Sequence, residues 1–190
     1  MEMAWQGGRR IHVIGGPGSG KTTLAAQAAL RLRVPFYELD TVGYEDGSGA
    51  ERPLPIRIAD IKRIAAQPGW VTEGVFLGWT HALFETADEI VWLDLPWRLV
   101  GWRIFLRHVK AELRGNNRHS GWRKLFHFMQ WARAYYTRSI HPGEAVIVEK
   151  DGDENRALTA QYLAVFSSRL VRCQTPADVQ AYLQSLPRLD

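Results

Sequence analysis

The segment GGPGSGKT at residues 15–22 constrains the fold of this chain more than any other part of the sequence. It fits the pattern G-x-x-x-x-G-K-[ST], and it follows an apolar run, Ile11 to Ile14, that is typical of a buried strand. Helical spacing of apolar residues begins at Lys21 and continues to about Leu32. This order of elements lets successive backbone N–H groups converge on one anion at the start of the helix. We therefore interpret the segment as a phosphate-binding loop rather than as a chance glycine-rich turn.

The loop predicts a specific set of nucleotide contacts. Lys21 is expected to reach the β- and γ-phosphates of ATP, and Thr22 is expected to place its hydroxyl on a Mg²⁺ ion. ATP and Mg²⁺ are therefore the expected cofactors. The loop residues expected to bind the nucleotide are Gly15, Gly16, Pro17, Gly18, Ser19, Gly20, Lys21, Thr22 and Thr23.

The length of the chain favours one domain that spans residues 1–190. A chain of 190 residues can bury one core and is short for two. Its longest stretch without Asp, Glu, Lys or Arg, Ala157 to Ser168, is too short for a membrane-spanning helix. The N-terminus lacks the apolar region of a secretory signal, and the single Cys173 cannot form an internal disulfide. These features predict a cytoplasmic protein without a membrane partner.

Predicted strands alternate with predicted helices along the chain. Beyond the first strand, strand patterns cover residues 35–40, 70–75, 89–94 and 170–174. Helical patterns between and after them begin at Lys21, Pro55, Leu99, Trp122 and Pro176. Thr175 is expected to cap the last helix, residues 41–53 are expected to form a loop, and residues 145–148 are expected to form a short strand or an extended connection. This alternation is typical of a parallel sheet covered by helices on both faces.

Several classes of phosphate-loop protein are excluded by motifs that the sequence lacks. It contains no Asn-Lys-x-Asp motif, with which a GTPase reads its base, and no Ser-Gly-Gly-Gln signature of a transporter ATPase. A loader-type ATPase with its additional domain needs a longer chain. The small kinases are the class that remains.

The chain resembles the adenylate-kinase-like P-loop kinases of the small-molecule and nucleoside kinase type, and within them the topology-modulation proteins. The matching segments are IHVIGGPGSGKTTLA at 11–25, ELD at 38–40, EGVF at 73–76, VWLDLPWRLVGWRIFLR at 91–107 and TPADVQAYLQSL at 175–186. The resemblance implies a doubly wound α/β fold with a five-stranded parallel sheet in which the first strand lies between the third and fourth. It also implies a helical, arginine-rich lid over about residues 98–138.

Three acidic residues fall at the predicted strand ends, where ligands bind in parallel sheets. Asp40 is predicted to contact a hydroxyl of the phosphoryl acceptor, as general base or as orienting group, rather than to act as a turn cap. Glu73 is a candidate for holding Mg²⁺ through water, although the family more often has Asp at this place. For Asp94 in the sequence LDLP we favour a structural role in a turn.

A basic segment follows the fourth predicted strand. Between Arg98 and Arg138 there are ten Lys or Arg and one acid, a net of +9 in a chain of formal net charge +4. Arg103 and Arg107 lie on one helical stripe, and the resemblance implies that they face the nucleotide. Lys21, Asp40 and Arg107 are the predicted catalytic residues. The resemblance further places phosphate-clamping arginines at Arg114, Arg118 and Arg123.

Aromatic residues are interleaved with these basic ones, a composition that also suits single-stranded nucleic acid. They are Trp102, Phe105, Trp122, Phe126, Phe128, Trp131, Tyr135 and Tyr136, and their helical spacing favours packing in the core or in the lid. His108, His119 and His127 show no metal-ligand spacing and are interpreted as residues near phosphate or at the surface. Cys173 is interpreted as a core residue.

We expect a kinase that transfers the γ-phosphoryl group of ATP to a small-molecule acceptor. The segment between Gly74 and Asp88 contains no arginine, and only Arg52 and Arg57 are available near the acceptor side. This composition favours an uncharged acceptor, or one of another kind, over a nucleoside monophosphate. The alternatives are a nucleic-acid-associated ATPase and a nucleotide-binding regulator with little catalysis. The sequence leaves the oligomeric state open.

Overall fold

The structure, a computed structural model, describes residues 8–113, 121–139 and 154–187. Five parallel strands form one sheet in the order β2-β3-β1-β4-β5, so β1 lies between β3 and β4 as predicted. The strands are β1 Arg10–Gly15, β2 Phe36–Glu38, β3 Trp70–Gly74, β4 Glu89–Leu93 and β5 Leu170–Cys173.

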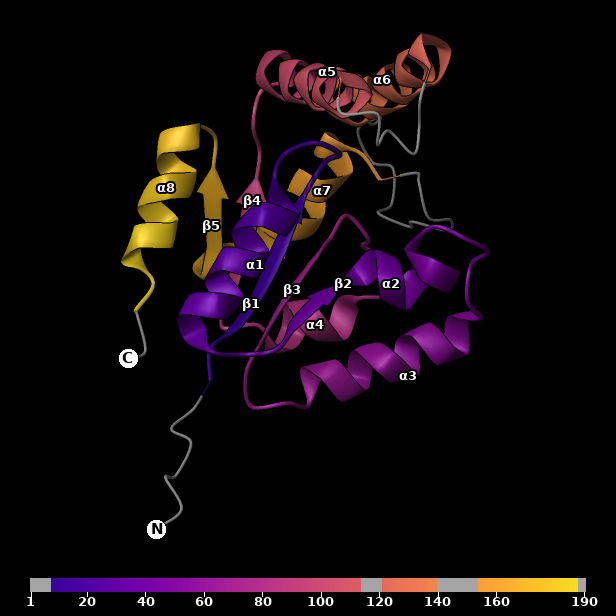
Figure 1. The fold of residues 1–190 in the computed structure, drawn as a ribbon. Coiled ribbons are helices and arrows are strands. Elements are labelled where there is room, and N and C mark those ends of the chain that lie inside the picture. The colour runs from indigo at the N-terminus through magenta and orange to yellow at the C-terminus, as the bar shows by residue number, and fades with distance from the viewer. Residues whose placement is uncertain (1–7, 114–120, 140–153, 188–190) are drawn as a thin grey trace.

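Helices cover both faces of the sheet, and two further helices lie beyond the carboxyl ends of the strands (Figure 1). The α-helices are α1 Lys21–Leu32, α2 Leu39–Gly43, α3 Leu54–Ala65, α4 His81–Thr86, α5 Trp97–Leu113, α6 Trp122–Thr137, α7 Arg156–Leu163 and α8 Pro176–Ser185. Two 3₁₀ helices are η1 Glu45–Gly47 and η2 Ala164–Arg169. The doubly wound α/β fold predicted from the sequence is therefore confirmed.

Each face of the sheet has its own apolar core because alternate strand side chains point to opposite faces. Ile11 and Val13 of β1 pack with the buried faces of α1 and α8. Ile14 packs in the other core, with residues of α3, α4 and α7. His12 is fully buried on β1, where burial lowers its pKa to about 3 and leaves the ring neutral. Among the described helices, none is long and apolar enough to cross a membrane.

Two predictions about local structure were wrong in part. The strand predicted over 35–40 ends at Glu38, and Asp40 lies in the first turn of α2 rather than at a strand end. The hydroxyl of Thr41 donates to the Glu38 carbonyl at 2.7 Å, which favours a helical start there. The loop predicted over 41–53 contains the end of α2 and η1.

Two helices were not predicted, one predicted helix cap is confirmed, and one possible strand lies outside the described residues. α4 and α7 were not predicted, although Asn155 caps α7 by accepting from the backbone amides of Ala157 and Leu158. The predicted cap at Thr175 is confirmed, because Thr175 and Asp178 form a reciprocal capping box. The possible strand at 145–148 lies outside the described residues.

Candidate functional site

The phosphate-binding loop connects β1 to α1 and leaves the first turn of the helix open. Gly18 and Gly20 have positive φ angles of 77° and 96°, a conformation that favours glycine. Gly20 is the N-cap of α1, and no side chain satisfies the amides of the first turn. An uncapped helix start of this kind presents donors and a positive dipole end to an anion.

Helices α5 and α6 hold the loop from the side opposite the sheet. The Arg103 guanidinium donates to the Ser19 carbonyl at 3.0 Å, and the Tyr136 hydroxyl donates to the Pro17 carbonyl at 3.2 Å. A Cβ atom at Gly16 would lie 2.4 Å from the ring of Tyr135, so this close contact needs glycine. The loop is therefore fixed by residues more than 80 positions away in the chain.

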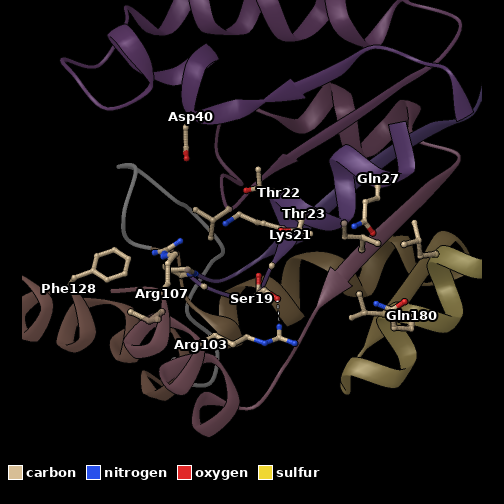
Figure 2. Close-up of a pocket in the computed structure, with 18 of the residues that line it drawn as sticks. Ser19, Lys21, Thr22, Thr23, Gln27, Asp40, Arg103, Arg107, Phe128 and Gln180 are labelled. Atoms are coloured by element: carbon tan, nitrogen blue, oxygen red, sulfur yellow. Dashed lines mark hydrogen bonds between the residues drawn. The ribbon is translucent and has the colours of Figure 1, made fainter. Parts of the chain in front are cut away.

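A cavity of about 630 Å³ opens in front of the loop, and Figure 2 shows the side chains that enter it. Asp40 approaches from α2, whereas Arg107 approaches from α5 on the other side. Gln27 of α1 and Gln180 of α8 lie at one end of the cavity, and Phe128 of α6 lies at the other. Ten residues with predicted roles thus line one space: Pro17, Gly18, Ser19, Gly20, Lys21, Thr22, Thr23, Asp40, Arg103 and Arg107. Gly15, Gly16 and Glu73 are not part of its lining.

Glu73 lies behind the loop and contacts both polar residues at the start of α1. The Thr22 hydroxyl donates to the Glu73 carboxylate at 3.0 Å, and the Lys21 ammonium lies 3.9 Å from its other oxygen. Burial raises the pKa of Glu73, as do the charges of Asp40 and Glu38, whereas Lys21 and Thr22 oppose the shift. Lys21 is therefore the cation that the structure places beside this carboxylate.

The Thr22–Glu73 pair fits a Mg²⁺ ion. Both residues offer oxygen ligands, and Glu73 Oε2 is buried without a hydrogen-bond partner among the described residues. Mg²⁺ usually keeps several waters and takes only one or two protein ligands. Within the same described ranges, no group of three or more His, Cys, Asp or Glu could hold a metal ion.

Asp40 and Arg107 are both exposed and carry opposite charges. Neither side chain forms an ion pair with another described residue. Two unpaired charges on opposite sides of a polar cavity can meet two different parts of a ligand. This arrangement differs from that of Asp94, which is fully engaged within the protein.

Asp94 joins three elements at the end of β4. Its side chain is 1% exposed and accepts hydrogen bonds from Arg156 at the start of α7 and Arg172 of β5, including one of 2.9 Å from each. Arg172 also lies over the ring of Trp92 at 4.6 Å. The structural role favoured for Asp94 is therefore confirmed, although it is an ion-pair centre rather than a simple turn.

Several residues considered from the sequence lie away from the main cavity. His108 was interpreted as a residue near phosphate or at the surface, which is wrong: it is 8% exposed and faces Glu112. Its spacing from Ile104, four residues, was the sign of a buried position on α5. Arg123 on α6 is exposed and is not part of the cavity wall. Arg114, Arg118 and His119 lie outside the described residues.

The aromatic residues of α5 and α6 are less buried than expected. Five of them are counted among the exposed large side chains: Trp102, Trp122, Phe126, Phe128 and Trp131. Core or lid packing is confirmed for Tyr135, which is buried, and for Phe105 and Tyr136, which are partly buried and pack against the apolar cluster that includes Ile104 and Leu125. Cys173 is buried as expected. Phe128 and Trp131 line the main cavity, a position that the sequence analysis missed. Their spacing of three residues shows that they share a helix face but not what that face meets.

Comparison with solved structures shows the same architecture across nearly the whole chain. A gluconokinase from Sinorhizobium meliloti 1021 is 18% identical, with 94% of this chain and 93% of that chain covered and a TM-score of 0.50. A sugar kinase from Janibacter sp. HTCC2649 is 15% identical, with 93% of each chain covered and a TM-score of 0.47. A shikimate kinase from Bacteroides thetaiotaomicron is 16% identical, with 94% and 95% covered and a TM-score of 0.44. The gluconokinase similarity shows that the fold is that of P-loop kinases.

Sequence comparison identifies the family. No family model matches the chain. A curated relative, described as the uncharacterized protein YqaC of Bacillus subtilis strain 168, is 31% identical over 133 residues. The match covers 67% of this chain and 72% of the relative. The chain belongs to the same family as YqaC.

Proposed function

We propose that this protein is a kinase that transfers the γ-phosphoryl group of ATP to a hydroxyl group of a small molecule. The observation that carries the proposal is the convergence of Lys21, Thr22, Asp40 and Arg107 on one cavity in front of an open helix start. The first two residues suit a nucleotide phosphate chain, Asp40 suits a hydroxyl group, and Arg107 suits charge on the phosphoryl group being transferred.

Each residue has a distinct task in the proposed reaction. The acceptor hydroxyl oxygen bonds to the γ-phosphorus, the bond from that phosphorus to the bridging oxygen breaks, and ADP leaves. The hydroxyl proton passes to the Asp40 carboxylate. Lys21 and Arg107 offset the negative charge on the phosphoryl oxygens. Thr22 and Glu73 would hold Mg²⁺, which when bound neutralises charge between the β- and γ-phosphates.

A screen for ADP release against a panel of metabolites tests this function. Wild type and Asp40→Asn are assayed in parallel with ATP and Mg²⁺, because asparagine keeps the size of the side chain but is a poor base. We expect one class of hydroxyl compound to be phosphorylated and the variant to be slower by about 10²-fold or more. An acceptor that is phosphorylated equally fast by both proteins would contradict the role of Asp40.

A nucleic-acid-associated ATPase, as in the topology-modulation proteins, is the second candidate. The observation that favours it is the exposure of Trp102, Trp122 and Phe126, which are 57%, 63% and 60% exposed. Stacking of bases on exposed aromatic rings among basic residues is a usual way to bind single strands. Stimulation of ATP turnover by DNA or RNA, together with steeply salt-dependent binding, would favour this function over small-molecule phosphorylation.

A further inference from the structure

The cations near the acceptor side of the cavity are engaged within the protein. Arg52 donates to the Val42 carbonyl at 2.8 Å and pairs with Asp60 at 2.9 Å. Arg57 is buried, lies 3.7 Å from Glu51 and stacks at 5.2 Å from the Trp79 ring centre. Neither arginine lines the cavity.

The cations that do line the cavity lie with the phosphate loop. They are Lys21, Arg103 and Arg107, and Arg103 already donates to the loop at Ser19. In the proposed reaction, Lys21 and Arg107 serve the phosphates of ATP. An acceptor with its own phosphate or carboxylate would therefore lack a dedicated cation among the described residues of this cavity.

The acceptor end of the cavity presents aromatic and apolar surface instead. Phe128 and Trp131 project from one face of α6, their ring centres 5.6 Å apart, and both remain exposed, by 36% and 52%. Val75, directly after β3, lines the cavity with them. Exposed aromatic faces on the wall of a polar cavity are suited to a flat ring in the ligand.

Trp131 also lines a second cavity, of about 200 Å³. This cavity shares Pro17, Val75 and Trp131 with the first. It is lined by one cation, Arg138, and one carboxylate, Glu154, so it adds no net positive charge for an anionic acceptor. The Trp131 side chain therefore borders both cavities. A ring system bound against Trp131 would occupy the same cavity as Asp40, the residue proposed to take the hydroxyl proton.

We propose that the acceptor is an uncharged alcohol built on a planar ring, such as a nucleoside, and that Phe128 and Trp131 bind the ring. This inference rests on the proposed function, since it names the acceptor of the same phosphoryl transfer. The hydroxyl oxygen of this alcohol forms the bond to the γ-phosphorus as ADP leaves, and its proton passes to Asp40. Trp131 and Phe128 determine which acceptor is bound.

Binding and turnover are measured separately. Calorimetric titrations use protein loaded with Mg²⁺ and a non-hydrolysable ATP analogue. Five nucleosides and pyridoxine are the planar-ring alcohols. Glycerol is the uncharged alcohol without a ring, gluconate is an alcohol without a ring that carries a carboxylate, and nucleoside monophosphates are planar-ring alcohols that carry a phosphate. We expect at least one planar-ring alcohol to bind and to be phosphorylated, and the ring-free and charged compounds to bind at least 10-fold more weakly.

Variants connect this preference to the two aromatic residues. Trp131→Ala and Phe128→Ala should each raise the acceptor Kd and KM by about 10-fold or more, as for other base-stacking residues, while the KM for ATP changes little. Trp131→Phe should restore most of the affinity. Phe126→Ala is the matched control, because Phe126 is on α6, is 60% exposed and lines a different groove. Thermal melting verifies that each variant is folded.

The outcomes separate this inference from the proposed function. Phosphorylation of gluconate or glycerol with an unchanged KM in Trp131→Ala overturns the ring site and leaves the kinase function standing. Trp131-dependent binding of a ring alcohol without any phosphoryl transfer supports the ring site and contradicts the kinase function. If none of the planar-ring alcohols binds the loaded protein, the inference is wrong.

Discussion

The phosphate loop and helix α6 line the same cavity, but their residues are held in different ways. In the loop, Gly15, Gly16 and Ser19 are buried, and α1 packs five buried residues of its 12 against the sheet. Helix α6 buries only Leu125, Ala132 and Tyr135 of its 16 residues. The proposed nucleotide end is thus fixed by the core of the fold, whereas the proposed acceptor end is a surface whose side chains can change without loss of the core.

Lys21→Ala should have the largest effect, since it removes the cation that the proposed function places on the β- and γ-phosphates. We expect kcat/KM to fall by about 10³-fold or more, and calorimetry should show weaker binding of ATP with Mg²⁺. The matched control is Lys62→Ala, an exposed lysine on α3 outside the cavity. Unchanged binding and turnover in Lys21→Ala would mean that the nucleotide site is elsewhere.

Arg107→Ala should slow phosphoryl transfer by about 10²-fold, an effect that falls mainly on kcat. The guanidinium reaches the cavity from α5, where it can meet charge that develops in the transition state. Arg133→Ala is the control, because Arg133 lines a groove on the other side of α6 together with Phe126. Steady-state kinetics compare the two variants. If the kcat of Arg107→Ala is as high as that of Arg133→Ala, Arg107 has no part in the chemistry.

Asp94→Ala should lower the free energy of unfolding by about 3 kcal/mol, measured by urea denaturation. This value is at the low end for breaking a buried ion pair, because Arg156 and Arg172 remain partly exposed and can be hydrated. The loss should exceed that of Asp60→Ala, whose carboxylate is less buried. A loss below about 0.5 kcal/mol, as for ordinary surface changes, would contradict the central role of Asp94.

Glu73→Gln should change the pH dependence of stability in the protein without nucleotide. The folded state raises the pKa of Glu73 through burial, so it holds that proton more tightly than the unfolded chain does. This contribution is fully present below the ordinary pKa of 4.5 and is lost as the pH rises through the folded value. Stability therefore declines between the ordinary pKa of 4.5 and the raised folded pKa of Glu73, and this decline should be shallower in the variant.

Urea denaturation between about pH 4 and pH 8 measures this slope. The same variant should lose the stabilisation that Mg²⁺ with ATP gives to wild type, while ATP alone still binds. If the free energy of unfolding depends on pH in the same way in both proteins, ionisation of the buried Glu73 does not lower the stability of the folded state.

The nucleotide end could be predicted from the sequence because its signals are local. Helix α1 has the predicted bounds, and the Thr175 cap depends on residues only three positions apart. The conversion of residues 39–43 into α2 depends on a hydrogen bond from Thr41 that competes with strand extension. Asn155, whose side chain caps α7, is a local sign of this helix in the sequence.

The acceptor end could not be predicted because it depends on contacts between distant residues. Phe128 and Trp131 line the cavity on a helix whose Tyr135 and Tyr136 contact the phosphate loop, more than 100 positions away in the chain. The helical period shows which residues share a face and says nothing about the neighbour that face will meet. Asp94 likewise gained its role from Arg156 and Arg172, which are 62 and 78 positions away.

The bonds from Arg103 and Tyr136 to the loop carbonyls also determine the direction of the loop's dipoles. A trans peptide places its C=O and N–H on opposite sides. Since the carbonyls of Pro17 and Ser19 point to α5 and α6, the N–H groups of Gly18 and Gly20 point to the opposite side of the loop. The orientation of these dipoles is set when the protein folds, so in the proposed function a phosphate would meet donors that need no rearrangement.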